Sequence, residues 1–383
     1  MTFSLDRVVP WGRSYEEYVR MFDLGPAELG GRILGCGDGP AAFQAELHRR
    51  GGRGVAVDPL YACSAAEIEQ RIAEVRGEVM AQVRANLADF VWTTIASPEQ
   101  LERRRLAAMA VFLADYEGGR RQGRYVAGEA QALPFAADAF DLALSSHFLL
   151  LYAEAVPLAQ HRLAIAELLR VAPELRLFPL LELGGAPSRH LEPLLAELGA
   201  QGCGLEQRRV AYELQRGGDT MLRIVRPVLD HEAIAALAAD FLAQRLPRER
   251  WTHQTHLAVG LWHLRRHGRP EALALLRSRI RAHNAAAGIG NDADNGYHET
   301  LTRFWLRALA AHEAAHPQAT TAGSLALLLR SPLASVDAPL RHYTPERLYS
   351  REARAGWLEP DLAPLPSQGA PRDRAEEGQG RAV

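Results

Sequence analysis

The stretch RILGCGDGPAAFQAELHRRGGRGVAVDPLY, residues 32–61, decides the fold. Its pattern predicts a short strand at 32–34, a glycine turn at 35–39, a helix at 41–50 and a second strand at 54–57 that ends on Asp58. Glycines between a buried strand and a helix let the backbone approach a ligand closely, because no Cβ stands in the way. Free N–H groups at the start of such a helix favour an electronegative group. An acid after the second strand is placed to accept two hydrogen bonds from a ribose diol, so the stretch predicts a nucleotide-type site.

The glycine turn alone leaves the identity of the nucleotide open. Residues 37–42, GDGPAA, fit the G-x-G-x-x-G/A fingerprint of dinucleotide-binding proteins, so an NAD-linked oxidoreductase is one interpretation. An ordinary turn between a strand and a helix also satisfies so short a pattern. The choice therefore depends on a second motif farther along the chain.

That second motif is GEAQALPFAADAFDLALSSHFLLLY at 128–152. Together with the glycine turn it resembles the class I S-adenosylmethionine-dependent methyltransferases, of the type 11-like group. These proteins have an acid-x-G-x-G turn, an acid after the second strand, and a G-[DE]-A-x-x-LPF-x(4)-FD run that covers the fourth strand. The residues that match this run in order are Gly128, Glu129, Ala130, Leu133, Pro134, Phe135, Phe140 and Asp141. The resemblance covers residues 12–226 and implies a seven-stranded Rossmann-like α/β sheet with S-adenosyl-L-methionine as its cofactor.

The resemblance also implies how individual residues would hold that cofactor. Gly35, Gly37 and Gly39 would belong to the cofactor-binding turn, with Gly37 and Gly39 lining the methionine side. Asp58 would hold the ribose hydroxyls, Glu129 would reach the adenine amino group, and the backbone N–H of Ala130 would meet the ring. The expected activity is transfer of the sulfonium methyl group to an unidentified small-molecule or peptide acceptor, driven mostly by orientation in a pocket that excludes water.

One departure from the family pattern concerns Gly35. It stands where these proteins usually have an acid that organises the turn and the methionine amino group. This departure supports an alternative interpretation, in which the chain is a SAM-binding or pseudo-methyltransferase scaffold. Its C-terminal half would then bind a ligand, a metal or a partner.

The strand predicted at 140–145 ends in the polar segment SSHF, residues 145–148. Ligands of open α/β sheets lie beyond the carboxyl ends of the strands, so we expect Ser146 to face the cofactor. His147 is the candidate general base, because an imidazole titrates near neutral pH. The alternative is that His147 only packs against its neighbours.

The rest of the N-terminal half predicts a complete methyltransferase-like domain at residues 1–227. Two strands at 204–214 and 220–225 predict a final antiparallel hairpin, which distinguishes methyltransferase sheets from NAD-binding Rossmann sheets. Residues 62–120 predict a helical insertion, which either shapes the substrate pocket or is purely structural. Within it, apolar residues recur at helical spacing in three segments, 65–76, 79–90 and 98–116.

Beyond residue 227 the pattern changes to helices only, which predicts an α-helical domain at 228–362 and a disordered tail at 363–383. This second half resembles bacterial helical domains of unknown function. His253 and His256 share one helix face, while His298 and Glu299 lie at a junction between a loop and a helix. These four residues are weak candidates for metal ligands, and a buried hydrogen-bond network or an organic-ligand pocket is the alternative.

The composition is that of an ordinary globular protein, with a net charge of −2 and 48% hydrophobic residues among 383. All basic residues are arginine, which rules out lysine Schiff-base chemistry and a Walker P-loop. The sequence has no block of basic residues that would predict a nucleic-acid partner. It also has no apolar run long enough to predict a membrane span. The first twenty residues do not resemble a signal peptide, so we expect a cytoplasmic protein.

Overall fold

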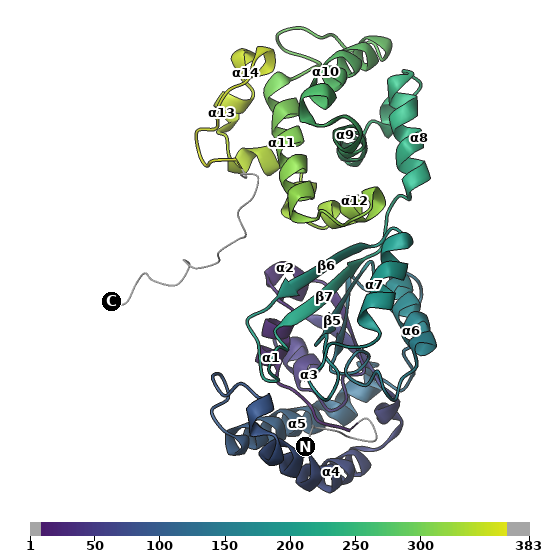
Figure 1. Ribbon diagram of the computed structural model, residues 1–383, viewed down its shortest axis with the longest axis vertical. Coiled ribbons are helices and arrows are strands. Elements are labelled where there is room, and N and C mark those ends of the chain that lie inside the picture. The colour runs from purple at the N-terminus through teal and green to yellow at the C-terminus, as the bar shows by residue number, and fades with distance from the viewer. Residues whose placement is uncertain (1–8, 366–383) are drawn as a thin grey trace, which may run out of the picture. The chain divides into compact units, whose positions relative to one another are not determined.

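The computed structural model describes residues 9–365. The chain divides into two compact units, with the boundary between Arg226 and Pro227 (Figure 1). The sequence places this boundary one residue later. Each unit has its own hydrophobic core and is described by itself.

The N-terminal unit is built on a seven-stranded sheet with the order β3-β2-β1-β4-β5-β7-β6. Neighbouring strands are parallel except that β7 runs antiparallel to both β5 and β6. The strands are β1 Arg32–Cys36, β2 Arg53–Val57, β3 Tyr125–Val126, β4 Leu142–Ser146, β5 Glu174–Phe178, β6 Gly204–Arg209 and β7 Thr220–Val225. This is the predicted Rossmann-like methyltransferase sheet, and its antiparallel β7 confirms the feature that argued against an NAD-binding sheet.

Helices cover both faces of this sheet, because successive strand residues point to opposite sides. In β1, for example, Ile33 packs with the helices of one face and Leu34 with those of the other. The helices of the two faces are α1 Tyr15–Met21, α2 Pro26–Leu29, α3 Phe43–Arg49, α6 Leu158–Val171 and α7 Leu191–Ala200 (Figure 1). A capping box between Ser14 and Glu17 starts α1, as their spacing predicts.

The insertion consists of two long helices, α4 Ala65–Ala85 and α5 Pro98–Arg121. The segments of helical spacing at 65–76 and 79–90 belong mostly to one helix, since α4 runs through Gly77 without a break and ends at Ala85. Its buried residues Ile72, Val75 and Val79 keep one apolar stripe on both sides of that glycine, so packing overrides the low helix propensity of glycine. An aromatic cluster holds the insertion against the β3 edge of the sheet and consists of Tyr61, Phe112, Tyr116 and Tyr125.

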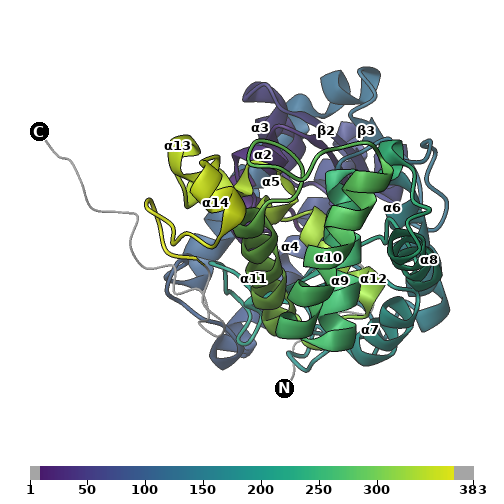
Figure 2. The ribbon, with the colours of Figure 1, turned by 90° about the horizontal axis from the view of Figure 1, so that it is seen from above.

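The C-terminal unit is helical throughout its described part, as predicted. Its helices are α8 His231–Leu242, α9 His253–His267, α10 Arg269–Ala286, α11 Glu299–Ala315, α12 Thr321–Leu329, α13 Pro345–Leu348 and α14 Arg351–Ala355. Helix α9 is central and packs against α8, α10, α11 and α12 (Figure 2). Within residues 9–365, none of the helices has the length and hydropathy required to cross a membrane. Most of the tail predicted to be disordered, from residue 366 onward, lies outside the described residues.

Candidate functional site

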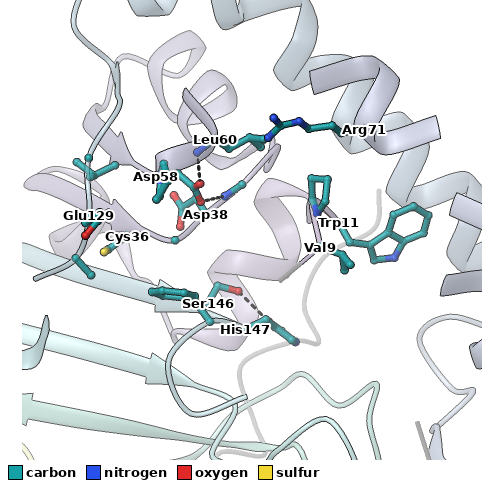
Figure 3. A pocket seen from close by; sticks show the side chains of 18 of the residues that line it. Val9, Trp11, Cys36, Asp38, Asp58, Leu60, Arg71, Glu129, Ser146 and His147 are labelled. Atoms are coloured by element: carbon teal, nitrogen blue, oxygen red, sulfur yellow. Dashed lines mark hydrogen bonds between the residues drawn. The ribbon is translucent and has the colours of Figure 1, made fainter. Parts of the chain in front are cut away.

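A cavity of about 920 Å³ opens at the carboxyl ends of β1, β2 and β4. Segments from across the N-terminal unit line it, including the N-terminal segment, the glycine turn, the end of β2, helix α4 and the loop after β3. Residues predicted to bind the cofactor that line this cavity are Gly37, Gly39, Asp58, Glu129, Ala130 and Ser146, together with the predicted catalytic residue His147 (Figure 3). Gly35 is absent from the lining.

The glycine turn has a backbone that requires glycine at two positions. Gly37 and Gly39 have φ values of 71° and 54°, in the left-handed region that side chains rarely adopt. A Cβ on Gly37 would lie 2.6 Å from the ring of Phe148, so the backbone passes directly over that ring. The amide of Gly37 also donates to the carbonyl of Val57 at 3.0 Å, which fixes the turn to the end of β2.

Asp58 joins the end of β2 to this turn (Figure 3). Its Oδ2 accepts the amide of Gly39 at 2.9 Å, and its Oδ1 accepts the amide of Leu60 at 2.8 Å. Burial raises the pKa of Asp58, and the two backbone donors oppose that rise. Each carboxylate oxygen keeps a second lone pair, so both remain able to accept a ribose hydroxyl. Asp58 therefore has a structural role beside the predicted binding role.

We expect Asp58→Ala to lower both stability and nucleoside affinity, because it leaves the amides of Gly39 and Leu60 without their acceptor. The two unsatisfied groups should cost about 1–3 kcal/mol in the free energy of unfolding. Affinity for S-adenosylhomocysteine should fall about 10- to 150-fold by calorimetry. Glu74→Ala is the matched control, since Glu74 lines the same cavity from the exposed side of α4. Unchanged affinity in a folded Asp58 variant would refute the ribose assignment.

Asp38 is a site residue that was not predicted from the sequence. The residue is 7% exposed, and Oδ1 accepts the hydroxyl of Tyr18 at 2.8 Å. Its Oδ2 is buried without a hydrogen-bond partner, and burial raises the pKa of the carboxyl to about 7. An ideal Cβ on Gly35 would lie 1.8 Å from this Oδ2. The turn therefore does not simply lack an acid, because the Asp38 carboxylate fills the space beside Gly35. An acid between two glycines was the signal available in the sequence.

Ser146 and His147 end β4 as a hydrogen-bonded pair. His147 has a φ of 53°, and its amide donates to the carbonyl of Phe178 at 2.6 Å. Its Nδ1 lies 2.9 Å from Oγ of Ser146, and its ring meets the edge of Phe178. Burial lowers the pKa of His147 well below its ordinary value, and the nearby cations Arg13 and Arg105 lower it further. The imidazole is therefore neutral near pH 7, and the same surroundings make it a weak proton acceptor.

The remaining predicted cofactor residues lie in the loop after β3. Glu129 is exposed, and its carbonyl accepts the amide of Ala132 at 3.2 Å, which tightens this loop. Ala130 is buried beside it. Trp11 and Arg71 also line the cavity and were not predicted as site residues from the sequence (Figure 3). Neither residue stands in a recognisable motif, and only the fold brings them to the site.

The four candidate metal ligands of the C-terminal unit are not gathered into one cluster. His298 caps α11, with Nδ1 accepting the amide of Leu301 and Nε2 bonded to the carbonyl of Leu348. Glu299 forms ion pairs with arginines, while His253 and His256 pack against tryptophan rings. In the described part of the chain, no group of three or more His, Cys, Asp or Glu side chains is arranged to hold a metal ion.

A buried histidine of α9 instead predicts a pH-dependent stability. His263 is 1% exposed, and neither ring nitrogen has a hydrogen-bond partner. Burial lowers its pKa to about 4, with smaller contributions from His267 and Arg266. The unfolded chain, with a histidine pKa near 6.5, therefore binds a proton more readily than the folded chain does. Stability should decline as the pH falls from about 6.5 towards 4.

We expect His263→Leu to raise the free energy of unfolding by about 1–3 kcal/mol at pH 7, because it removes two unsatisfied buried nitrogens. It should also reduce the loss of stability between pH 6.5 and 4. Thermal unfolding of the full chain at several pH values measures both effects. His48→Gln, which replaces an exposed histidine on α3, is the control. A destabilised leucine variant with unchanged pH dependence would contradict this account.

The strand order, the glycine turn and the cavity together define a Rossmann-like domain of the methyltransferase type. No family model matches the chain. It is 31% identical over 224 residues to the uncharacterized protein MJ0045 of Methanocaldococcus jannaschii, a match that spans 58% of this chain and 98% of that protein. The chain belongs to the family of MJ0045.

Solved structures with some likeness to this chain include two methyltransferases. One is magnesium protoporphyrin IX methyltransferase from Synechocystis PCC 6803 with bound SAM, at 14% identity over 52% of this chain and 72% of that chain, with a TM-score of 0.29. The other is a SAM-dependent methyltransferase from Thermotoga maritima, a possible histamine N-methyltransferase, at 13% identity over 56% and 89%, with a TM-score of 0.28. The assignment of the fold follows from the strand order of this chain itself.

Proposed function

We propose that the N-terminal unit binds S-adenosyl-L-methionine and transfers its methyl group to a small-molecule or peptide acceptor. The cavity around the glycine turn is the observation that carries this proposal. The donors and acceptors in its wall suit the cofactor: the turn leaves room for close backbone approach, and Asp58 has lone pairs free for the ribose hydroxyls. Glu129 and Ala130 would meet the adenine. When bound, the cofactor would supply a sulfonium-activated methyl group.

The residues of this chain would then orient the acceptor and keep water out, which is where most of the acceleration of a direct transfer arises. His147 would be the proton acceptor for a substrate that must lose a proton. Burial and the nearby cations lower its pKa, which makes it a weak base in the free protein. The acceptor would lie against the part of the cavity wall that Trp11 forms, on the side away from Glu129 (Figure 3).

Calorimetric titration of the full chain with S-adenosylhomocysteine and with NAD tests this proposal. We expect S-adenosylhomocysteine to bind and NAD to give no heat of binding. Binding of NAD alone would overturn the proposal in favour of an oxidoreductase. If neither ligand binds, the proposal is also refuted, and the scaffold interpretation is supported instead.

A further inference from the structure

Asp38 is a buried carboxyl group whose environment is incomplete. Its Oδ1 accepts the Tyr18 hydroxyl, whereas Oδ2 has no hydrogen-bond partner although it is shielded from water. A buried carboxylate left with one donor is costly, and structures keep such groups when something else completes them. Because Asp38 is also part of the cavity wall, the missing partner can come from a ligand.

The other carboxylate at this end of the cavity is already engaged. Both oxygens of Asp58 accept backbone amides, whereas Asp38 accepts the phenol of Tyr18 and has the side-chain amide of Gln44 as a weaker neighbouring donor. The empty face of Gly35 makes room for the Asp38 carboxylate, since any side chain at residue 35 would collide with Oδ2. The turn is therefore shaped to hold an acid at residue 38.

We propose that Asp38 receives the α-ammonium group of the cofactor's methionine end, and so supplies the carboxylate that Gly35 cannot. This inference rests on the proposed function. An ammonium group is a compact cation with three donors, and it would provide both the charge and the hydrogen bond that Oδ2 lacks. Tyr18 would hold the carboxyl in place through the other oxygen.

Binding should be accompanied by release of protons near neutral pH. The empty site raises the pKa of Asp38 to about 7, first by burial and further by the charge of Asp58, so a large share of the molecules carries a proton there at pH 6.5. A bound ammonium group favours the ionised carboxylate and expels that proton. The other titratable groups facing Asp38 stay neutral, since burial raises the pKa values of Tyr18, Cys36 and Tyr61.

Calorimetry of the full chain at pH 6.5, in two buffers of different ionisation enthalpy, measures this proton release. We compare S-adenosylhomocysteine with 5′-methylthioadenosine, which has the nucleoside but lacks the amino acid end. Wild type should release a substantial fraction of a proton with the first ligand and much less with the second. Asp38→Asn should abolish the release and weaken S-adenosylhomocysteine binding about 10- to 150-fold, with 5′-methylthioadenosine binding unchanged.

The retained binding of 5′-methylthioadenosine shows that the asparagine variant is folded. Tyr18→Phe gives a second test, because loss of the phenol donor should move the proton release to higher pH. The inference is overturned if the asparagine variant binds S-adenosylhomocysteine like wild type, or if both ligands lose affinity by the same factor. It is equally overturned if wild type releases no proton. If neither nucleoside binds to wild type, the proposed function fails, and this inference fails with it.

Discussion

Replacing Glu17 with glutamine is expected to lower the free energy of unfolding of the N-terminal unit by about 3–5 kcal/mol. Glu17 and Arg105 form an ion pair between α1 and α5, with side chains 6% and 1% exposed. Tyr212 donates to the same carboxylate at 2.9 Å. Glutamine keeps the shape but removes the charge, so the buried guanidinium of Arg105 is left uncompensated beside a second buried cation, Arg13.

Hydrogen exchange in peptides from α1 and α5 measures this loss without interference from the C-terminal unit. Glu16→Gln is the control, because Glu16 is the exposed neighbour on α1 and makes only a surface ion pair. A Glu17 variant no less stable than the Glu16 variant would show that the pair contributes little net stability.

The same ion pair predicts how the stability of the N-terminal unit falls at acid pH. Burial opposes the charge on Glu17, but Arg105 outweighs it and holds the pKa of Glu17 at about 2. Its contribution to stability is complete above the unfolded pKa, near 4.3, and is lost as the pH falls from there towards 2. In the glutamine variant, this part of the acid sensitivity should disappear.

The elements that the sequence predicts well are those with local signals. The strands β1 and β2, the turn between them and Asp58 follow one another within thirty residues, and each has a recognisable pattern. Arg105 shows where such signals end. It stands in a run of charged residues, ERRR, that is typical of an exposed helix face, yet it is buried because Glu17 and Tyr212 meet it from distant segments.

The role of Asp38 was hidden for a similar reason. The family motif has an acid where this chain has Gly35. The carboxylate that fills that space belongs to Asp38, three residues later. Its orientation depends on Tyr18, a helical residue outside the motif. A sequence pattern shows which residue types recur at which spacing. It does not show which side chains occupy neighbouring space in the folded protein.

The last prediction concerns Gly35 and Asp38, because the Asp38 carboxylate occupies the space that a side chain at residue 35 would need. On sequence grounds an acid at residue 35 would tighten cofactor binding. The structure predicts instead that any side chain at residue 35 destabilises the fold, because even a methyl group there would lie 1.8 Å from Oδ2 of Asp38. We expect Gly35→Ala to lower the free energy of unfolding by about 1–3 kcal/mol, as overpacking does in a filled core. In an Asp38→Ala background the same substitution should cost much less.

A double-mutant cycle on these two residues, followed by hydrogen exchange in the peptide containing β1, isolates their coupling. Gly77→Ala is the matched control for a glycine-to-alanine change, since Gly77 lies in α4 with open space around its Cβ position. That control should gain about 0.5–1 kcal/mol from helix propensity. An equal cost of Gly35→Ala in both backgrounds would mean that the pressure on residue 35 comes from somewhere other than the Asp38 carboxylate. A strong coupling would mean that the glycine is there because the acid is at residue 38.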